Sequence, residues 1–103
     1  MNPSKNRFSK EIRIGSRTVG FDHPTYFIAE IGANFDGNLE KAKRLMVEAK
    51  NAGADTAKFQ SFLSKKIVSG RGFSKMTLKG VHGTWQRGVD EVFADAELPR
   101  EWH

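Results

Sequence analysis

The feature that most constrains the fold is an amphipathic helix pattern that stands between two short strand patterns. Residues 39–52 carry apolar side chains at helical spacing, so one stripe of the predicted helix is apolar. Residues 26–31 are apolar apart from Glu30, which is typical of a buried parallel strand, and residues 56–62 read as a second strand. A helix that links two such strands predicts a right-handed βαβ unit with parallel strands, and therefore an α/β fold.

Both ends of the predicted helix carry recognisable signals. Asp36 or Asn38 can cap its first turn through a side-chain oxygen, and Gly53 can end it. Glu40 lies in the first turn, where a negative charge interacts favourably with the helix dipole, and it is spaced to pair with Arg44 one turn later. These signals make the helix the best-defined element that the sequence predicts.

Residues 1–24 form a separate N-terminal region. A polar tail is followed, over residues 11–21, by alternating apolar and polar side chains around a Gly-Ser turn, which predicts a short β-hairpin. Pro24 then interrupts the strand pattern, because proline cannot donate to a β-ladder. We therefore assign residues 1–24 to a tail and hairpin, and residues 25–103 to the βαβ portion of an incomplete domain.

The region after the second strand pattern is less regular. Residues 64–83 are rich in Gly, Ser and Lys and predict a long loop with little regular structure. A helix is predicted over Val89–Ala96, directly after Gly88, and Pro99 suits the first turn of a further helix. Two strands are fewer than an independent sheet normally needs, so we expect the chain to be the N-terminal fragment of a larger α/β protein.

Composition excludes several classes of protein. The chain has no cysteine, which rules out disulfides and thiolate metal sites, and no apolar run approaches the roughly 18–20 residues that span a bilayer. The N-terminus lacks the apolar core of a secretory signal, so we expect a cytoplasmic protein. The net charge is +5, but the basic residues are dispersed, which argues against nucleic-acid binding. A small basic module for nucleic acid or another polyanion remains the alternative.

The candidate site combines Glu30, Lys58 and Gln60. Glu30 and Lys58 fall in the later parts of the two predicted parallel strands, and ligands of α/β sheets and (β/α)8 barrels bind at that edge. On neighbouring strands the two charges would project side by side, with Gln60 on the same face as Lys58. Lys58 suits a phosphate or carboxylate, whereas Glu30 and Gln60 suit hydroxyls, and Glu30 can also transfer a proton. The alternative is a structural Glu30–Lys58 ion pair that binds nothing.

Other motifs carry less chemistry. Asn34 and Asp36, in the loop after the first strand, can shape the turn and cap the helix, or the loop can hold an anion at the helix N-terminus. Neither a dinucleotide fingerprint nor a P-loop occurs there. His23, His82 and His103 are far apart in sequence, so we expect neither a metal site nor a catalytic triad within this chain.

Three motifs together resemble a known family. AEIGAN at residues 29–34, AGAD at residues 52–55 and KFQ at residues 58–60 are similar to the N-terminal part of the sialic acid synthase (N-acetylneuraminate synthase) family. The resemblance extends from about Ile12 to His103. It implies that the chain holds the first two strands of a (β/α)8 TIM barrel, preceded by the hairpin.

The resemblance also implies a function. Members of the family are transferases of carbohydrate biosynthesis that condense phosphoenolpyruvate with N-acetylmannosamine or a related aldose to give a nine-carbon 2-keto sugar acid and phosphate. By matching position, Lys58 would contact phosphoenolpyruvate, and Glu30, as the catalytic residue, and Gln60 would contact the sugar. A divalent metal, manganese or magnesium, would activate the aldehyde with ligands that lie outside this chain. The full-length family would be homodimeric. The aldose stays open among a mannosamine derivative, its 6-phosphate and a bacterial diamino sugar.

The chain departs from the family pattern in two places. The family loop often reads N-H-x-G, and Phe35 stands here in place of that histidine. Residues 74–83 do not align with the family, so no role is transferred to them. Because the later barrel strands are absent, we expect the chain alone to be inactive and poorly folded, and a non-catalytic remnant is a third interpretation.

Overall fold

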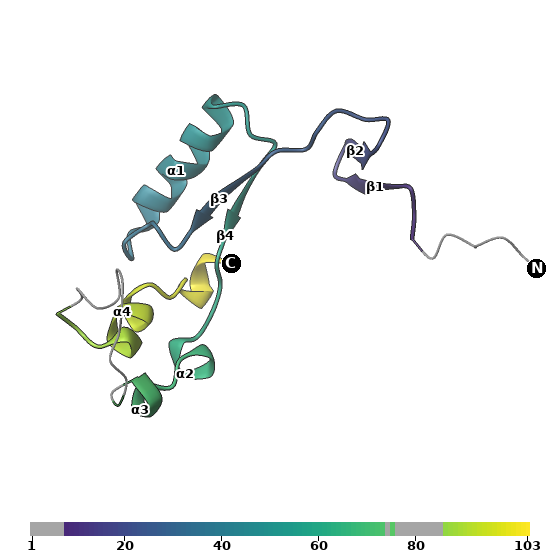
Figure 1. Ribbon diagram of the computed structural model, residues 1–103. Helices are drawn as coiled ribbons and strands as arrows, with labels where there is room; N and C mark the ends of the chain where they lie inside the picture. The colour runs from purple at the N-terminus through teal and green to yellow at the C-terminus, as the bar shows by residue number, and fades with distance from the viewer. Residues whose placement is uncertain (1–7, 74, 76–85) are drawn as a thin grey trace, which may run out of the picture.

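The computed structural model describes residues 8–73, 75 and 86–103, which form two small sheets followed by short helices (Figure 1). This mixed α/β class is the one that the sequence predicts. The part of the predicted loop that falls on residues 74 and 76–83 lies outside the described residues. Within the described part of the chain, no helix is both long and apolar enough to cross a membrane.

The predicted β-hairpin is confirmed. Strand β1 (Glu11–Ile14) pairs antiparallel with β2 (Arg17–Gly20), and the turn between them uses Gly15 at a φ of +60°. That left-handed conformation favours glycine, which has no Cβ to clash. The hairpin lies to one side of the remaining elements (Figure 1).

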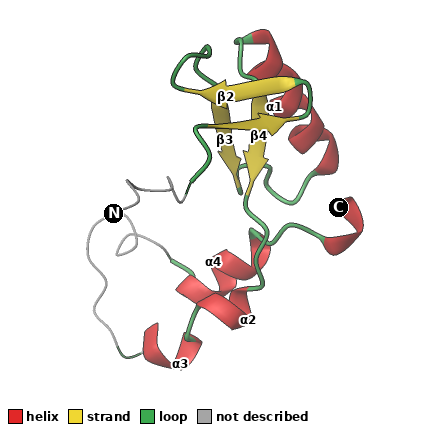
Figure 2. Cartoon of the chain, turned by 90° about the vertical axis from the view of Figure 1, so that its right-hand side faces the viewer, coloured by secondary structure: helices red, strands yellow, loops and turns green. Residues whose placement is uncertain are grey.

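The βαβ unit is confirmed as well. Strand β3 (Ile28–Gly32) and strand β4 (Thr56–Phe59) are parallel neighbours, and helix α1 (Leu39–Asn51) connects them. Figure 2 shows α1 lying along one side of the two strands. Strand β3 begins two residues later and ends one residue later than predicted, and β4 ends three residues earlier, because the ladder finishes where β3 does. Gly32 turns into the left-handed region at a φ of +62°, and the Gln60 amide makes the final bond, to the Gly32 carbonyl, at 3.0 Å.

The ends of α1 match the prediction, whereas its ion pair does not. The Asn38 side chain accepts from the Lys41 amide at 2.9 Å, so Asn38 is the cap, and Gly53 follows the last turn at a φ of +94°. Glu40 pairs with Lys43 at 3.0 Å, so the predicted pairing with Arg44 is wrong. Positions three apart on a helix are neighbours just as positions four apart are, and here the nearer lysine is the partner.

The C-terminal region contains more helix than predicted. Residues 64–73, predicted as loop, form α2 (Ser64–Ile67) and α3 (Gly70–Phe73), while α4 (Val89–Asp95) follows Gly88 as expected. The predicted turn after Pro99 is a 3₁₀ helix, η2 (Arg100–Trp102). Helices of four residues are about one turn long, far shorter than the window of roughly 11–18 residues in which helical periodicity can be recognised, which is why the loop prediction was wrong.

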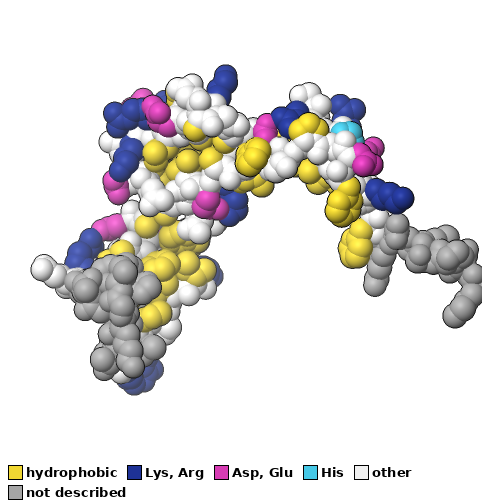
Figure 3. Space-filling model, turned by 45° about the horizontal axis from the view of Figure 1, so that its top comes forward, with side chains coloured by type: hydrophobic (Ala, Val, Ile, Leu, Met, Phe, Trp, Pro, Cys, Tyr) yellow, Lys and Arg dark blue, Asp and Glu magenta, His cyan; other side chains and the backbone are white. Residues whose placement is uncertain are grey.

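The core is small. The ring of Phe35 is 0% exposed and lies 6.2 Å from the ring of Phe59 and 5.6 Å from that of Trp102, centroid to centroid. Many other apolar side chains stay in contact with solvent, as Figure 3 shows. On β3 alone, Ile28 is 57% exposed. The radius of gyration is 19.3 Å, against roughly 13 Å for a compact domain of about 100 residues, so these elements do not close around one core.

Candidate functional site

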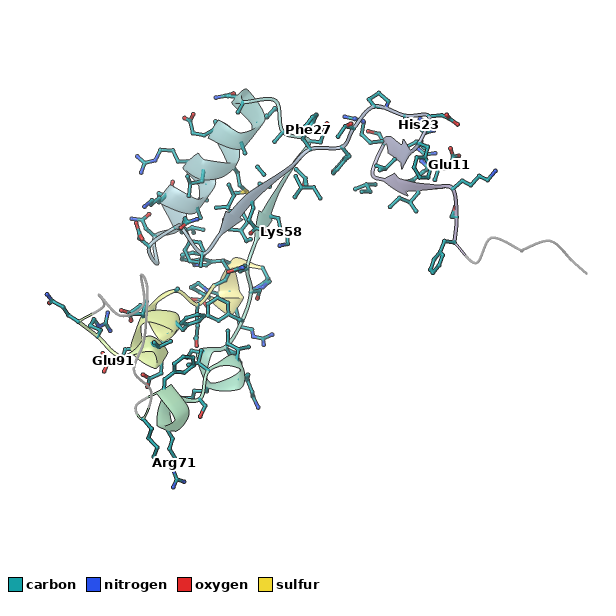
Figure 4. All side chains as sticks on the ribbon, in the orientation of Figure 1. Glu11, His23, Phe27, Lys58, Arg71 and Glu91 are labelled. Atoms are coloured by element: carbon teal, nitrogen blue, oxygen red, sulfur yellow. The ribbon has the colours of Figure 1, made fainter. Side chains whose placement is uncertain are left out.

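Glu30 and Lys58 occupy opposed positions on β3 and β4, as predicted. The register pairs the two residues, and Lys58 Nζ donates to Glu30 Oε2 at 2.6 Å. Their side chains are 50% and 57% exposed. An ion pair this accessible to water contributes at most about 1 kcal/mol to stability, so the fold does not depend on it. Both charges therefore remain available to a ligand from solvent. Figure 4 shows Lys58 at the end of the strand pair that is nearest to the short helices.

Three polar side chains converge at the end of β3. A Cβ on Gly32 would lie 3.5 Å from Glu30 Oε1, 3.8 Å from Asn34 Nδ2 and 4.0 Å from Gln60 Oε1. Gly32 also adopts the left-handed conformation that favours glycine, so its missing side chain both permits the turn and leaves this point open. Gln60 thus joins Glu30, as the strand pattern predicted.

Asn34 has two roles at this point. Its Nδ2 donates to the Ile31 carbonyl at 2.9 Å, which confirms the predicted role in shaping the turn. The same amide lines the pocket beside Glu30. The sequence pattern indicated only the first role, because the spacing of a turn residue does not show where its side chain points.

A pocket of about 420 Å³ opens at this point, within the range of about 300–1,000 Å³ that is usual for small-molecule sites. The three converging polar side chains form one side of it. The other side is apolar and comes from residues beyond β4: Phe62, Val92 and Phe93. The Phe62 and Phe93 rings pack with centroids 5.8 Å apart. Sequence reasoning missed this apolar side, because only the folded chain brings α4 back to the end of β4.

A neighbouring pocket of about 510 Å³ is lined by charged side chains that already have partners in the protein. Arg87 pairs with Asp95 and donates to Glu91 at 3.2 Å. Hydrogen bonds to Asp95 and then to Glu91 raise the pKa of Arg87 above its usual value. Asp36, on the other side, pairs with Lys41. Because these charges satisfy one another, the pocket beside Glu30 is the better candidate.

No three His, Cys, Asp or Glu side chains among residues 8–73, 75 and 86–103 come together in a way that could hold a metal ion. His23 lies 2.9 Å from Glu11 on the hairpin, where Figure 4 shows both residues far from Lys58. His103 contacts Ser61, and His82 lies outside the described residues. The divalent metal that the family resemblance implies would therefore need ligands from outside this part of the chain.

The structure is thus a mixed α/β chain with a candidate pocket at the carboxyl ends of two parallel strands. Sequence comparison is more specific, although no family model matches the chain. The chain is 35% identical over 83 residues to a pseudaminic acid synthase of Campylobacter jejuni, which covers 80% of this chain and 24% of that protein. It is 34% identical over 90 residues to the spore coat polysaccharide biosynthesis protein SpsE of Bacillus subtilis, covering 87% of this chain and 23% of that protein.

The human N-acetylneuraminate-9-phosphate synthase is 57% identical over 44 residues, which are 43% of this chain and 12% of that protein. These similarities confirm the family that the motifs predicted: the chain is related to the sialic acid synthases of carbohydrate biosynthesis. It spans about a quarter or less of the length of these relatives.

Proposed function

We propose that this chain is the N-terminal part of a sialic-acid-type synthase that joins phosphoenolpyruvate to N-acetylmannosamine or a related aldose and releases phosphate. One observation carries the proposal. A carboxylate, an ammonium and two amides from Glu30, Lys58, Asn34 and Gln60 gather at the ends of two parallel strands. The substrates of such a synthase are an anion and a polyol, and these are the groups that bind them.

The ion pair gives each charge a role in the proposed reaction. In the free protein Glu30 holds the Lys58 ammonium. An incoming phosphate or carboxylate would compete for that ammonium and free the Glu30 carboxylate for a sugar hydroxyl or a proton. Because both side chains are half exposed, this exchange needs no rearrangement of buried groups. Gln60 and Asn34 would then orient the sugar through hydrogen bonds.

The proposal includes the larger protein. Residues 25–103 would supply the first βαβ portion of a (β/α)8 barrel, with the hairpin before it. The exposed side chains of Phe27 and Ile28 support this, because a further strand or helix would cover them. The remaining barrel would carry the metal ligands and the other substrate contacts, in a homodimer.

A basic polyanion-binding module is the weaker alternative. Among the described residues, five cationic side chains are already paired with carboxylates, which reduces the positive surface available to a polyanion. These side chains are Arg17, Lys41, Lys43, Lys58 and Arg87.

The test is an assay of the protein as its gene encodes it, with manganese present. We expect phosphate release that requires both phosphoenolpyruvate and an aldose. N-acetylmannosamine, its 6-phosphate and a diacetamido hexose would be compared as the second substrate. Phosphate release that proceeds at the same rate without any aldose would contradict the proposal. So would the absence of phosphate release with every one of the three sugars.

A further inference from the structure

The residue after Gln60 makes an unusual contact. Ser61 Oγ lies 2.9 Å from Nε2 of His103, and Nδ1 of the same ring lies 3.1 Å from the Arg100 carbonyl oxygen. A carbonyl oxygen can only accept, so Nδ1 carries the proton. In the neutral ring Nε2 is then the acceptor, and the Ser61 hydroxyl donates to it. The Arg100 carbonyl therefore selects the tautomer of His103 that is protonated on Nδ1, and the Ser61 hydroxyl donates to the other ring nitrogen.

The residue after Asn34 is held by the same short segment. The Phe35 ring is completely buried and meets the Trp102 ring at an interplanar angle of 66°. Trp102 ends η2 and directly precedes His103. Residues 99–103 therefore contact the segment after β3 at Phe35, one residue beyond Asn34. They also contact the segment after β4 at Ser61, one residue beyond Gln60.

We propose that residues 99–103 form a brace that positions Asn34 and Gln60 in the pocket. Backbone bonds fix the bases of the two segments: the Gln60 amide donates to the Gly32 carbonyl at 3.0 Å, and the Asn34 backbone amide donates to the Ile31 carbonyl at 3.2 Å. The segments beyond these bonds are held in place by the brace, through Phe35 and Ser61. Lys58 lies within the ladder on β4, whereas the braced residue Ser61 follows the end of that strand.

The brace consequently positions the side-chain amides of Asn34 and Gln60 but not the ammonium of Lys58. The effect of the brace on sugar binding rests on the proposed function, whereas the geometry of the brace does not. Two sets of measurements separate the two claims, both on the protein as its gene encodes it.

The first measurement follows the geometry by NMR, with ¹⁵N-labelled histidine and glutamine. We expect the His103 ring of the wild type to show an unprotonated Nε2 and a protonated Nδ1. Ser61→Ala is expected to shift the His103 Nε2 signal, because that nitrogen loses its hydrogen-bond donor, and to shift the Gln60 side-chain amide signals. Ser61→Thr, which keeps the hydroxyl, is expected to restore both. Ser9→Ala is the matched control, because the Ser9 hydroxyl also donates a hydrogen bond, in its case to the Glu11 carbonyl, but it lies by the hairpin.

The second measurement follows kinetics. Ser61→Ala and Trp102→Phe are expected to raise KM for the aldose about two- to tenfold, the effect of one lost or misplaced hydrogen bond. KM for phosphoenolpyruvate is expected to stay within about twofold, because Lys58 is not braced. A general loss of folding would instead lower the active fraction for both substrates alike.

Two results would overturn the brace: a protonated Nε2 on neutral His103, or Gln60 amide signals that Ser61→Ala leaves unchanged. Equal changes in both KM values would also contradict it. If the wild type has no synthase activity, the proposed function fails, while the NMR signals still decide whether the brace exists.

Discussion

Phe35 is a core residue although it lies in the loop between β3 and α1. In this chain it fills the core against Phe59 and Trp102. We expect Phe35→Ala to cost about 3–5 kcal/mol of unfolding free energy, because it leaves a cavity in the best-packed cluster. Phe21→Ala is the matched control: Phe21 is fully exposed, and its replacement is expected to change stability by about 0.5 kcal/mol or less. Urea denaturation of both variants, made in the protein as its gene encodes it, measures the difference, and equal midpoints would contradict the packing role.

Glu30 is expected to matter for reaction far more than for stability. Glu30→Gln keeps the shape of the side chain but removes its charge and its capacity to take a proton. If Glu30 transfers a proton, kcat falls about 10²- to 10⁴-fold. The free energy of unfolding changes by about 1 kcal/mol or less, because the Lys58 pair is half exposed. Glu48→Gln, on the exposed side of α1, is the control. A kcat equal to that of the control would remove the catalytic role.

At the residue scale, strand alternation was enough to predict that Glu30 lies beside Lys58 and close to Gln60. It could not predict the apolar side of the pocket. Phe93 lies more than thirty positions beyond Gln60, and only tertiary packing brings it back to Phe62. Nor could it predict Phe35 as core, because one aromatic side chain in a polar loop has no periodicity.

Among the elements, Asp55 joins the hairpin to the βαβ unit. Its Oδ2 accepts from the Phe27 amide at 2.8 Å, and its other oxygen pairs with Arg17 on β2. The backbone hydrogen bond from Phe27 lowers the pKa of Asp55, and the Arg17 contacts lower it further against some desolvation. A lowered folded-state pKa stabilises the fold above the unfolded-state pKa, and this stabilisation is lost as the pH falls through the folded value.

We therefore expect acid to detach the hairpin. The Tm deficit of Asp55→Asn relative to wild type is expected to be largest above about pH 5 and to shrink below about pH 4. Thermal unfolding of the protein as its gene encodes it, between pH 3 and 7, measures this deficit, with Asp22→Asn, at an exposed aspartate in the connector, as the control. A deficit that is constant across this range would show that the charge of Asp55 is not what matters.

The elements differ in how well the sequence predicted them. Helix α1 has thirteen residues, a cap at Asn38 and an apolar stripe, so local signals were sufficient. Helix α2 has four residues, and its start is held by a distant carboxylate: the Ser64 amide donates to Glu97 at 2.6 Å. That hydrogen bond also lowers the pKa of Glu97. No local pattern in residues 64–73 could indicate a helix that depends on a contact of this kind.

For the whole molecule, exposed apolar surface is the main physical fact. Phe27 is 60% exposed, and Phe8, Met46 and Val47 are exposed as well. We expect the 103-residue chain, expressed alone, to lack a cooperative thermal transition, because its two-stranded sheets bury too little surface. Circular dichroism on heating, with the molar mass checked by light scattering, tests this. A sharp transition from a monomer would show that the described elements are sufficient as a domain.

The central claim is that the ends of β3 and β4 bind an anion and a sugar in one synthase site. Its most direct test is the steady-state kinetics of Lys58→Ala in the protein as its gene encodes it, beside the control Lys66→Ala on α2. Loss of a charged hydrogen bond is expected to lower kcat/KM for phosphoenolpyruvate about 10- to 150-fold. The control is expected to match the wild type. If Lys58→Ala and Lys66→Ala give the same kcat/KM for phosphoenolpyruvate, the account of this site is wrong.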